Sequence, residues 1–533
     1  MGVRSAWREL WRSNPEPMPR PKSRMFGAAQ ASRLTSDWVT SVTSADQEIK
    51  GSLKRLRSRS RQLVRDNDYA KSTVRVVRNS VVGTGVRLQA QIKRQRGGKL
   101  DTRINEQIEK AWSNWGRKDS CNTAGQLCFA DVEKLAVSSM CESGEVFVRI
   151  VRQKFGRSKV SFALEVLEAD QLDEDYQSPA RTAGSVWRMG IEIDKFGRAL
   201  NYAFLSRHPG DTAFPTQAKE RRHIIVPAKD VVHLFDRASG RPGQTRGVPW
   251  LASGMQRMHH LDGWEQASVV RARASSALMG FIQSPEGELD PGGEVYDGER
   301  VSGFEPGQFK YLQPGETVTI PDMDSPTGEY EPFLRAQLRA LASGVGCSYE
   351  TISNDYSQSN YSSSRLALLQ DRDNWRSIQQ LMREQFYQPI YDAWLEMAVL
   401  SGALNLPTYE TEPERYEAVR WVFRGYSYVD PQKEINAQKD AVRSGFKTLA
   451  DCVAESGGDL DELLVARQAE LAKLDEMNII TDTDPSAVSA AGLIQSRPQN
   501  TVDASGDTPA PSGDDAAPNT EDIEPDVEPS DVD

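Results

Sequence analysis

Side chains that commonly perform catalysis or hold metals are few in this 533-residue chain. Its histidines and cysteines show neither the H-E-x-x-H nor the C-x-x-C spacing that holds a zinc ion. It has no G-x-S-x-G serine motif, and Gly97-Gly98-Lys99-Leu100 lacks the spacing and the Ser or Thr of a phosphate-binding loop. We therefore expect no catalytic residue, no metal ion and no cofactor. This favours a structural or binding role over an enzyme.

One acidic cluster keeps an enzyme open as the alternative. Five acids follow a predicted strand at residues 162–166: Glu168, Asp170, Asp173, Glu174 and Asp175. A two-metal nuclease needs such carboxylates, although a run of this kind more often forms a solvated loop. The alternative function is a metal-dependent nuclease that uses Glu168, Asp170 and Asp173. An ATPase is disfavoured because the phosphate-binding loop is missing.

Basic residues gather nearer the N-terminus. Residues 50–103 contain sixteen Lys or Arg against three Asp. Successive helical residues turn by about 100°, so the bases within a predicted helix at 44–80 surround more than one of its faces. Either they contact nucleic-acid phosphates or they are solvated or pair with acids elsewhere in the chain, and the second interpretation has more weight. Few aromatic residues alternate with them, which argues against a platform that stacks single-stranded bases.

The overall charge is just as uneven. Residues 499–533 contain eleven Asp or Glu and no Lys or Arg, which leaves residues 1–498 with 65 acids and 65 bases. No apolar run approaches the ~18 residues that span a membrane. The first ten residues include Arg4, Arg8 and Glu9, where a signal peptide would be apolar. The five scattered cysteines are expected to be reduced thiols.

Hydrophobic periodicity predicts an α+β fold that is mostly helical. The first half contains predicted helices at 44–80, 104–115 and 129–141 and a strand-rich region at 145–236, with a hairpin turn at 194–198. The second half begins with an Ala- and Ser-rich helix at 251–282, a Gly- and Pro-rich segment at 283–325, a helix at 331–345 and a polar loop at 348–361.

The longest predicted helix, 362–401, contains Pro389. Its apolar stripe continues from Phe386 to Ile390, which favours one helix over two separate ones. Proline has no N–H to bond the carbonyl of Gln385, so we expect a kink at Pro389. Shorter helices are expected over 430–480. The acidic tail beyond about Asp482 cannot bury a core and is expected to be disordered.

Five segments also carry a family likeness. They are GTGVRLQ at 83–89, ESGEVFVR at 142–149, RPGQTRGVPW at 241–250, NYSSSR at 360–365 and VDPQKE at 429–434. In this order they resemble the lambda-type portal proteins of tailed bacteriophages, from roughly residue 25 to residue 480. Beside this family, the alternative enzyme is the nuclease or a DNA-packaging enzyme subunit. A head–tail adaptor is a third possibility, but adaptors are usually much shorter chains.

The resemblance implies a function without catalytic residues. Portal subunits form a homo-oligomeric ring, usually of twelve, at one vertex of the capsid. Double-stranded DNA enters through its channel during packaging and leaves during ejection, without sequence specificity. The implied partners are the terminase large subunit, head–tail adaptor or completion proteins, and capsid and scaffold proteins, with no membrane. The implied location is the virion, after assembly in the cytoplasm of the host bacterium.

The resemblance also divides the chain into parts. In order, these are a Pro-rich basic arm (1–30), wing (31–250), first stem helix (251–282), clip (283–328), second stem helix (329–347), tunnel loop (348–361), long wing helix with return strand (362–428), crown (429–481) and acidic tail (482–533). The residues implied to face DNA in the tunnel loop are Asn354, Tyr356, Gln358, Asn360 and Tyr361. Those implied to pack between neighbouring stem helices are Ala267, Ala272 and Ser276.

Overall fold

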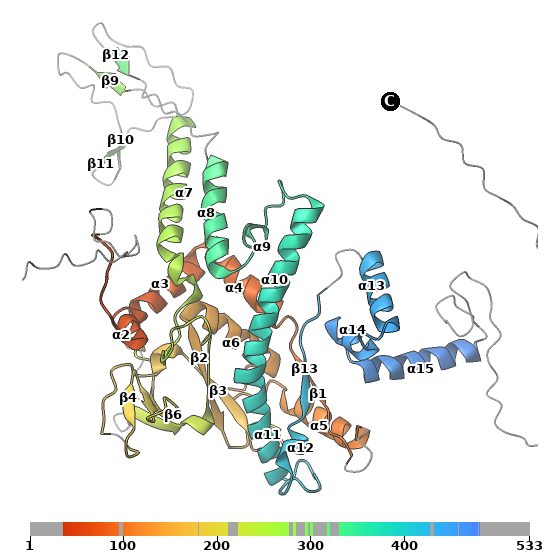
Figure 1. The fold of residues 1–533 in the computed structure, drawn as a ribbon. Coiled ribbons are helices and arrows are strands. Elements are labelled where there is room, and N and C mark those ends of the chain that lie inside the picture. The colour runs from red at the N-terminus through yellow and green to blue at the C-terminus, as the bar shows by residue number, and fades with distance from the viewer. Residues whose placement is uncertain are drawn as a thin grey trace, which may run out of the picture. The chain divides into compact units, whose positions relative to one another are not determined.

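The computed structural model describes residues 33, 36–94, 100–179, 181–211, 222–276, 281–283, 294–296, 299–301, 317–319, 330–426, 431–456, 458–477 and 479. The chain divides into two compact units, Met1–Leu460 and Asp461–Asp533. The first has a mixed α+β fold (Figure 1). The predicted arm at 1–30 and tail at 482–533 lie outside the described residues. None of the described helices combines the length and the apolar character that crossing a membrane requires.

The single helix predicted over 44–80 is wrong, because three helices occupy this region. They are α2 (Ala45–Lys50), α3 (Leu53–Asp66) and α4 (Asp68–Val81). Ser44 caps α2 as its sequence suggests, accepting a hydrogen bond from the Gln47 amide at 3.3 Å. The break that the sequence analysis missed is Asn67, whose carboxamide oxygen accepts from the amides of Tyr69 and Ala70 at 3.1 and 3.0 Å and begins α4.

The strand-rich region forms two antiparallel sheets. One has the order β3-β2-β8, and the other has the order β4-β5-β6-β7. The strands of the first are β2 (Glu145–Val151), β3 (Ala163–Leu167) and β8 (Val231–Phe235); those of the second are β4 (Val186–Arg188), β5 (Ile191–Ile193), β6 (Ala199–Leu205) and β7 (His223–Pro227). The predicted hairpin is confirmed: the Asp194 carboxylate accepts from the amides of Phe196 and Arg198, both at 2.8 Å.

Aromatic side chains hold helices and strands together in the largest core. Trp112 on α5 (Thr102–Trp115) lies 5.0 Å, centroid to centroid, from Trp394 on α11 (Gln388–Leu400). It also lies 5.1 Å from Phe129 at the start of α6 (Phe129–Ser143). Trp421 joins from β13 (Val419–Val422), which pairs with β1 (Arg87–Ala90). All five cysteines are free thiols, as expected.

The predicted helix 251–282 is partly wrong at both ends. A short 3-10 turn, η5 (Trp250–Ser253), precedes α7 (Met255–Ser276), and Phe281–Gln283 is strand β9, paired with β12 (Thr317–Thr319). Another strand pair joins β10 (Glu294–Tyr296) to β11 (Glu299–Val301). The next predicted helix is confirmed as α8 (Tyr330–Val345). The helices α7 and α8 lie side by side (Figure 1), with Trp264 stacked on Tyr330 at 5.0 Å.

The long predicted helix runs without a gap from α10 (Tyr361–Met382) through a π-helical turn, η6 (Arg383–Tyr387), into α11. In this turn the Gln388 N–H bonds to the carbonyl of Arg383, five residues back. Pro389 follows directly, so the wider turn accommodates the residue that cannot donate. Phe386 and Tyr387 within it are fully buried. The kink at Pro389 itself stays a prediction.

The remaining helices are short. They are α9 (Tyr349–Ser353), α12 (Pro413–Tyr416), α13 (Pro431–Arg443) and α14 (Leu449–Glu455), and α15 (Leu460–Glu476) makes up most of the described part of the second unit. Thr448 begins α14 with a capping box, in which its hydroxyl accepts from the Asp451 amide at 3.1 Å.

We predict that the π-helical turn is needed because Pro389 follows it. Deleting the exposed Glu384 would close the turn into a regular helix and place Pro389 against the carbonyl four residues before it. We expect this deletion to lower the free energy of unfolding by about 3 kcal/mol. The Pro389→Ala background should remove most of that loss. Urea unfolding followed by circular dichroism measures both, and an equal loss in the two backgrounds would contradict this role of the turn.

Candidate functional site

The acidic cluster expected for a nuclease lies against the basic helix α3. Lys54 bonds to Asp175 at 2.9 Å, and Arg57 bonds to Glu174 at 2.6 Å. Arg61 pairs with both Asp170 and Glu168. The acidic cluster is therefore paired with bases of α3, which make up part of the basic cluster. Arg57 and Arg61 are engaged by carboxylates and not available for nucleic-acid phosphates, whereas the exposed pair of Lys54 with Asp175 is weak.

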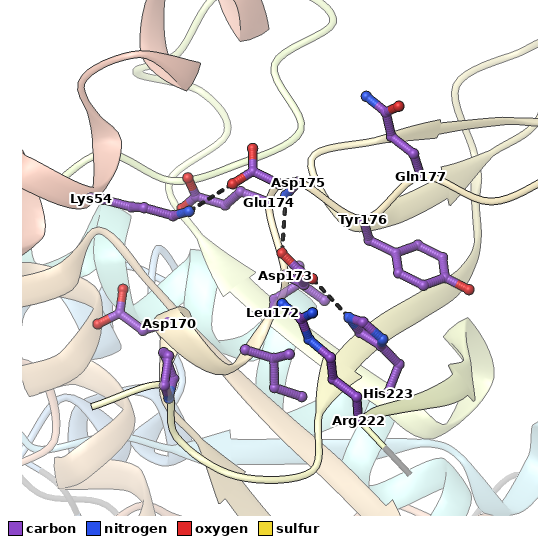
Figure 2. Close-up of a pocket in the computed structure, with 12 residues that line it drawn as sticks. Lys54, Asp170, Leu172, Asp173, Glu174, Asp175, Tyr176, Gln177, Arg222 and His223 are labelled. Atoms are coloured by element: carbon purple, nitrogen blue, oxygen red, sulfur yellow. Dashed lines mark hydrogen bonds and ion pairs between the residues drawn. The ribbon is translucent and has the colours of Figure 1, made fainter. Parts of the chain in front are cut away.

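A cavity of about 750 Å³ opens beside these pairs. Figure 2 shows Asp175 turned toward Lys54 and Asp173 turned toward His223, two different partners. Asp173 faces His223, with 2.7 Å between the carboxylate oxygen and Nε2. The three carboxylates proposed for the nuclease are therefore not assembled around one centre.

Glu168 and Asp170 do come together with His208, whose ring was not expected there. Their ligand atoms lie within 4.8 Å of one another. However, the Arg61 guanidinium already pairs with both carboxylates, at 3.3 Å to Glu168 and closer to Asp170. A fixed positive charge thus occupies the place that a divalent cation would need, and these residues do not fit a metal centre.

The buried end of the charge network centres on Glu145, at the start of β2. One oxygen of its carboxylate accepts from Arg57 at 2.5 Å and from Arg246 Nε at 2.8 Å. The other accepts from the Gly247 amide and faces His233 Nε2, both at 2.9 Å. The Glu145 and Arg246 side chains are fully inaccessible to solvent. Glu145 thus joins α3, β2, β8 and the segment 246–247.

Two glycines make this convergence possible. A Cβ on Gly144, whose φ is +88°, would lie 2.3 Å from the carbonyl carbon of Val248. A Cβ on Gly247 would lie 2.1 Å from the carbonyl oxygen of Gly144. Only residues without side chains allow the two backbones to approach this closely. The two segments belong to the motifs ESGEVFVR and RPGQTRGVPW, so two of the family-like motifs meet at Glu145.

The network fixes the protonation states of its members. Burial alone would raise the pKa of Glu145, but Arg246 and Arg57 outweigh it and hold that pKa far below its ordinary value. Burial lowers the pKa of His233 to about 4, although the hydrogen bond to Glu145 opposes this shift. At neutral pH the carboxylate is therefore ionised and the imidazole neutral.

The predicted stem residues fall on the outer half of α7. The first half of this helix is buried through Met255, Met258 and Leu261, which pack with Leu338 and Leu341 of α8. Ala267 and Ala272 are exposed beyond that core. Ser276 ends the helix, and its side chain lies outside the described residues. Val269 and Val270 are also exposed, by 57% and 62%, which the sequence analysis did not note.

The polar loop predicted at 348–361 is partly helical, because α9 occupies Tyr349–Ser353 and Tyr361 already belongs to α10. Asn354 adopts a left-handed φ of 54° and ends α9. Asn360 begins α10, and its side chain accepts from the Ser363 amide at 2.8 Å. Asn354, Tyr356, Gln358 and Asn360 are exposed; the Tyr361 side chain lies outside the described residues.

Two aspartates that the sequence analysis missed hold this loop in place. The buried Asp371 of α10 accepts from the Ser348 amide at 2.8 Å and from the Thr351 hydroxyl at 2.7 Å. Asp355 accepts from the Tyr349 hydroxyl at 2.7 Å and faces Arg335 of α8 at 3.5 Å. The loop therefore projects from a fixed base. Because Asp371 lies 10 residues beyond the loop, nothing in the loop sequence indicated it.

Comparison with known proteins decides between the portal, nuclease and adaptor hypotheses. The family model described as phage portal protein, lambda family, matches residues 31–379, more than half of the chain. The chain belongs to the lambda family of phage portal proteins. The expected function, a portal ring at one capsid vertex, follows from this membership. Portal proteins are structural, so family membership weighs against the nuclease together with the paired carboxylates.

Individual relatives agree with the family. The chain is 28% identical over 453 residues to the probable portal protein of Halomonas phage phiHAP-1, covering 83% of this chain and 85% of the relative. It is 21% identical over 504 residues to portal protein B of Escherichia phage lambda, covering 88% of this chain and 92% of the relative. A solved structure of the neck of an empty gene transfer agent particle aligns over 77% of this chain and 93% of its own, at 13% identity. Its TM-score of 0.37 is too low to establish a shared arrangement of elements.

The Glu145 network predicts that the buried Arg57 contributes strongly to the stability of the fold. Arg57→Ala would leave Glu145 and Glu174 buried with fewer positive partners, and we expect a loss of about 3–5 kcal/mol in the free energy of unfolding. Arg59→Ala, two residues away and exposed, is the matched control and should change little. Chemical denaturation of both variants tests this. Equal, small losses would show that the network contributes little.

The lowered pKa of His233 predicts that the stability of the fold depends on pH. Its folded pKa lies below its unfolded value near 6.5, so the unfolded chain binds the extra proton between about pH 6.5 and pH 4, and stability falls as the pH falls through that window. Lowering the pH from 7 to 5 should therefore reduce the stability of the protein relative to His233→Gln by about 2 kcal/mol. The exposed His260→Gln is the control and should track the unaltered protein. Parallel pH profiles for His233→Gln and the unaltered protein would contradict the assignment.

Proposed function

We propose that this chain assembles into a closed portal ring of twelve subunits whose central channel passes double-stranded DNA into and out of the capsid. The observation that carries the proposal is the family match over residues 31–379. The paired helices α7 and α8 support it as the stem, and the strand pairs β9–β12 and β10–β11 between them in sequence support a small clip. The terminase large subunit and the head–tail adaptor dock on this ring, and capsid and scaffold proteins are its further partners.

The subunit contact of the proposed stem is the exposed half of α7. Small side chains at Ala267 and Ala272 allow helices to approach closely, and Val269 and Val270 offer exposed apolar surface to a neighbour. A second copy of the chain would cover these residues. The remaining parts keep the boundaries given above, corrected so that the first stem helix is Met255–Ser276 and the tunnel loop is limited to residues 354–360.

The proposed channel contact is the exposed tip of that loop. Tyr356 is 60% exposed and Gln358 is also exposed, whereas Asn354 and Asn360 end and begin helices. Uncharged side chains suit DNA that slides, because many phosphate contacts by Lys or Arg would bind it tightly.

Overpacking the stem should disrupt assembly. We expect Ala272→Trp to force neighbouring helices apart at about 1–3 kcal/mol per interface and to reduce the ring to smaller species. Ser113→Trp, at an exposed position of α5, is the control and should leave the ring intact. Multi-angle light scattering gives the mass of each. Full-size rings from Ala272→Trp would place the subunit contact elsewhere.

The loop tip is tested best without removing Asp355, because deleting residues 355–359 would also break its bonds to Tyr349 and to Arg335. The double variant Tyr356→Ala/Gln358→Ala should still form rings but package or retain less DNA, since only the tip would face the channel. Genome length in packaged particles and ring mass are the two readouts. If the variant formed normal rings that package and retain a full genome, the loop tip would not be the channel contact.

A further inference from the structure

A basic pocket lies where α10, β13 and the region around α14 border one cavity of about 440 Å³. Four positive side chains line it: Arg376, Arg420, Arg424 and Lys447. Two negative ones, Asp451 and Glu455, accompany them, and Tyr426 contributes an aromatic ring. We call this the Tyr426 pocket. None of its side chains belongs to the stem, to the loop tip or to the Glu145 network.

Guanidinium groups gather around the Tyr426 ring. The Arg372 Cζ lies 5.4 Å from the ring centroid, and the Arg424 Cζ lies 5.9 Å from it. Arg372 and Arg376 are one helical turn apart on α10, so they share a face. Burial lowers the pKa of Arg372, Glu434 opposes this shift, and the nearby Arg376 and Arg424 lower the pKa further. Arg376 and Arg424 thus stand close to Arg372, and the Glu434 carboxylate offsets part of this positive charge.

The two carboxylates do not neutralise the whole pocket. Both oxygens of Glu455 accept from Lys447 at 2.9 Å, and Asp451 faces Arg420 at 3.5 Å. Arg424 donates to the neutral carbonyl of Asn79 at 2.6 Å, and among the described residues no carboxylate pairs with it. Arg376 pairs with Asp373 at 3.1 Å, but this pair is 58% and 75% exposed and therefore weak. Arg424 is therefore left without a carboxylate partner among the described residues, and Arg376 keeps only a weak, exposed one.

We propose that the Tyr426 pocket binds phosphate groups of the double-stranded DNA backbone, independently of sequence. The proposal rests on the proposed function, because a portal ring is what brings DNA to this chain. A guanidinium matches a phosphate with two parallel N–H donors. Two such arginines next to two carboxylates form a weak contact that salt easily breaks, which suits DNA that has to move.

The test compares matched double variants of the full chain. Anisotropy of a short labelled DNA duplex, measured over a series of KCl concentrations, gives the binding constant and its salt slope. Arg376→Gln/Arg424→Gln should weaken binding at low salt by roughly tenfold, and the slope of log K against log[salt] should become shallower by about 1.8. Arg117→Gln/Arg157→Gln removes the same charge from exposed loops elsewhere and should leave the slope unchanged. Equal changes in both double variants would overturn the proposal.

Further arms separate the other outcomes. If the double variant misfolds, Arg376→Gln alone, which alters an exposed side chain, should still make the slope shallower by about 0.9. If the pocket lost poly-glutamate binding in the variant while DNA binding persisted, it would dock an acidic protein segment and the DNA assignment would be wrong. Light scattering on the same samples reports the ring. Rings that bind no DNA would overturn this inference and leave the proposed function, whereas absence of rings in the unaltered protein would overturn the proposed function.

Discussion

The buried carboxylate of Glu145 is the constraint on which the body of this protein depends. An ionised group without solvent must be fully paired, and here two guanidiniums, one imidazole and one backbone amide supply the partners. These partners come from α3, from β8 and from the segment at 246–247. The N-terminal helices, the first sheet and the chain that enters α7 are therefore held at one point. Removing one of the two guanidiniums would leave the buried carboxylate with less compensation.

Local patterns in the sequence were sufficient where a short stretch decides the outcome. The helix α8, the hairpin at 194–198 and the strand-rich character of residues 145–236 were all predicted from periodicity and turn residues. The errors have local causes too. Asn67 ends α3 and caps α4 within a stretch whose apolar spacing is helical throughout. The end of α7 lies within a run of Ala and Ser that gives no signal for where the helix stops. Composition alone could not set these boundaries.

Pairings over long sequence distances could not be predicted, although their members were visible. The acids at 168–175 and the bases of α3 were each recognised as clusters, yet more than 100 residues separate Arg57 from Asp170 and Glu174. Whether an acidic and a basic cluster pair with each other or bind a ligand depends on the tertiary fold. The structure pairs the acids at 168–175 with bases of α3 and leaves Arg424, in the Tyr426 pocket, without a carboxylate partner among the described residues. The loop that we assign to the channel depends in the same way on Asp371, which lies outside it in sequence.

Assembly of a closed ring is the central claim of this account, since the stem, the channel and the docking of partners all require it. Negative-stain electron microscopy of the purified full-length chain tests it most directly. We predict ring-shaped particles of twelve subunits around a central hole, with α7 and α8 of each subunit forming the wall of the channel. Monomers or open filaments under conditions in which the chain is folded would contradict the account.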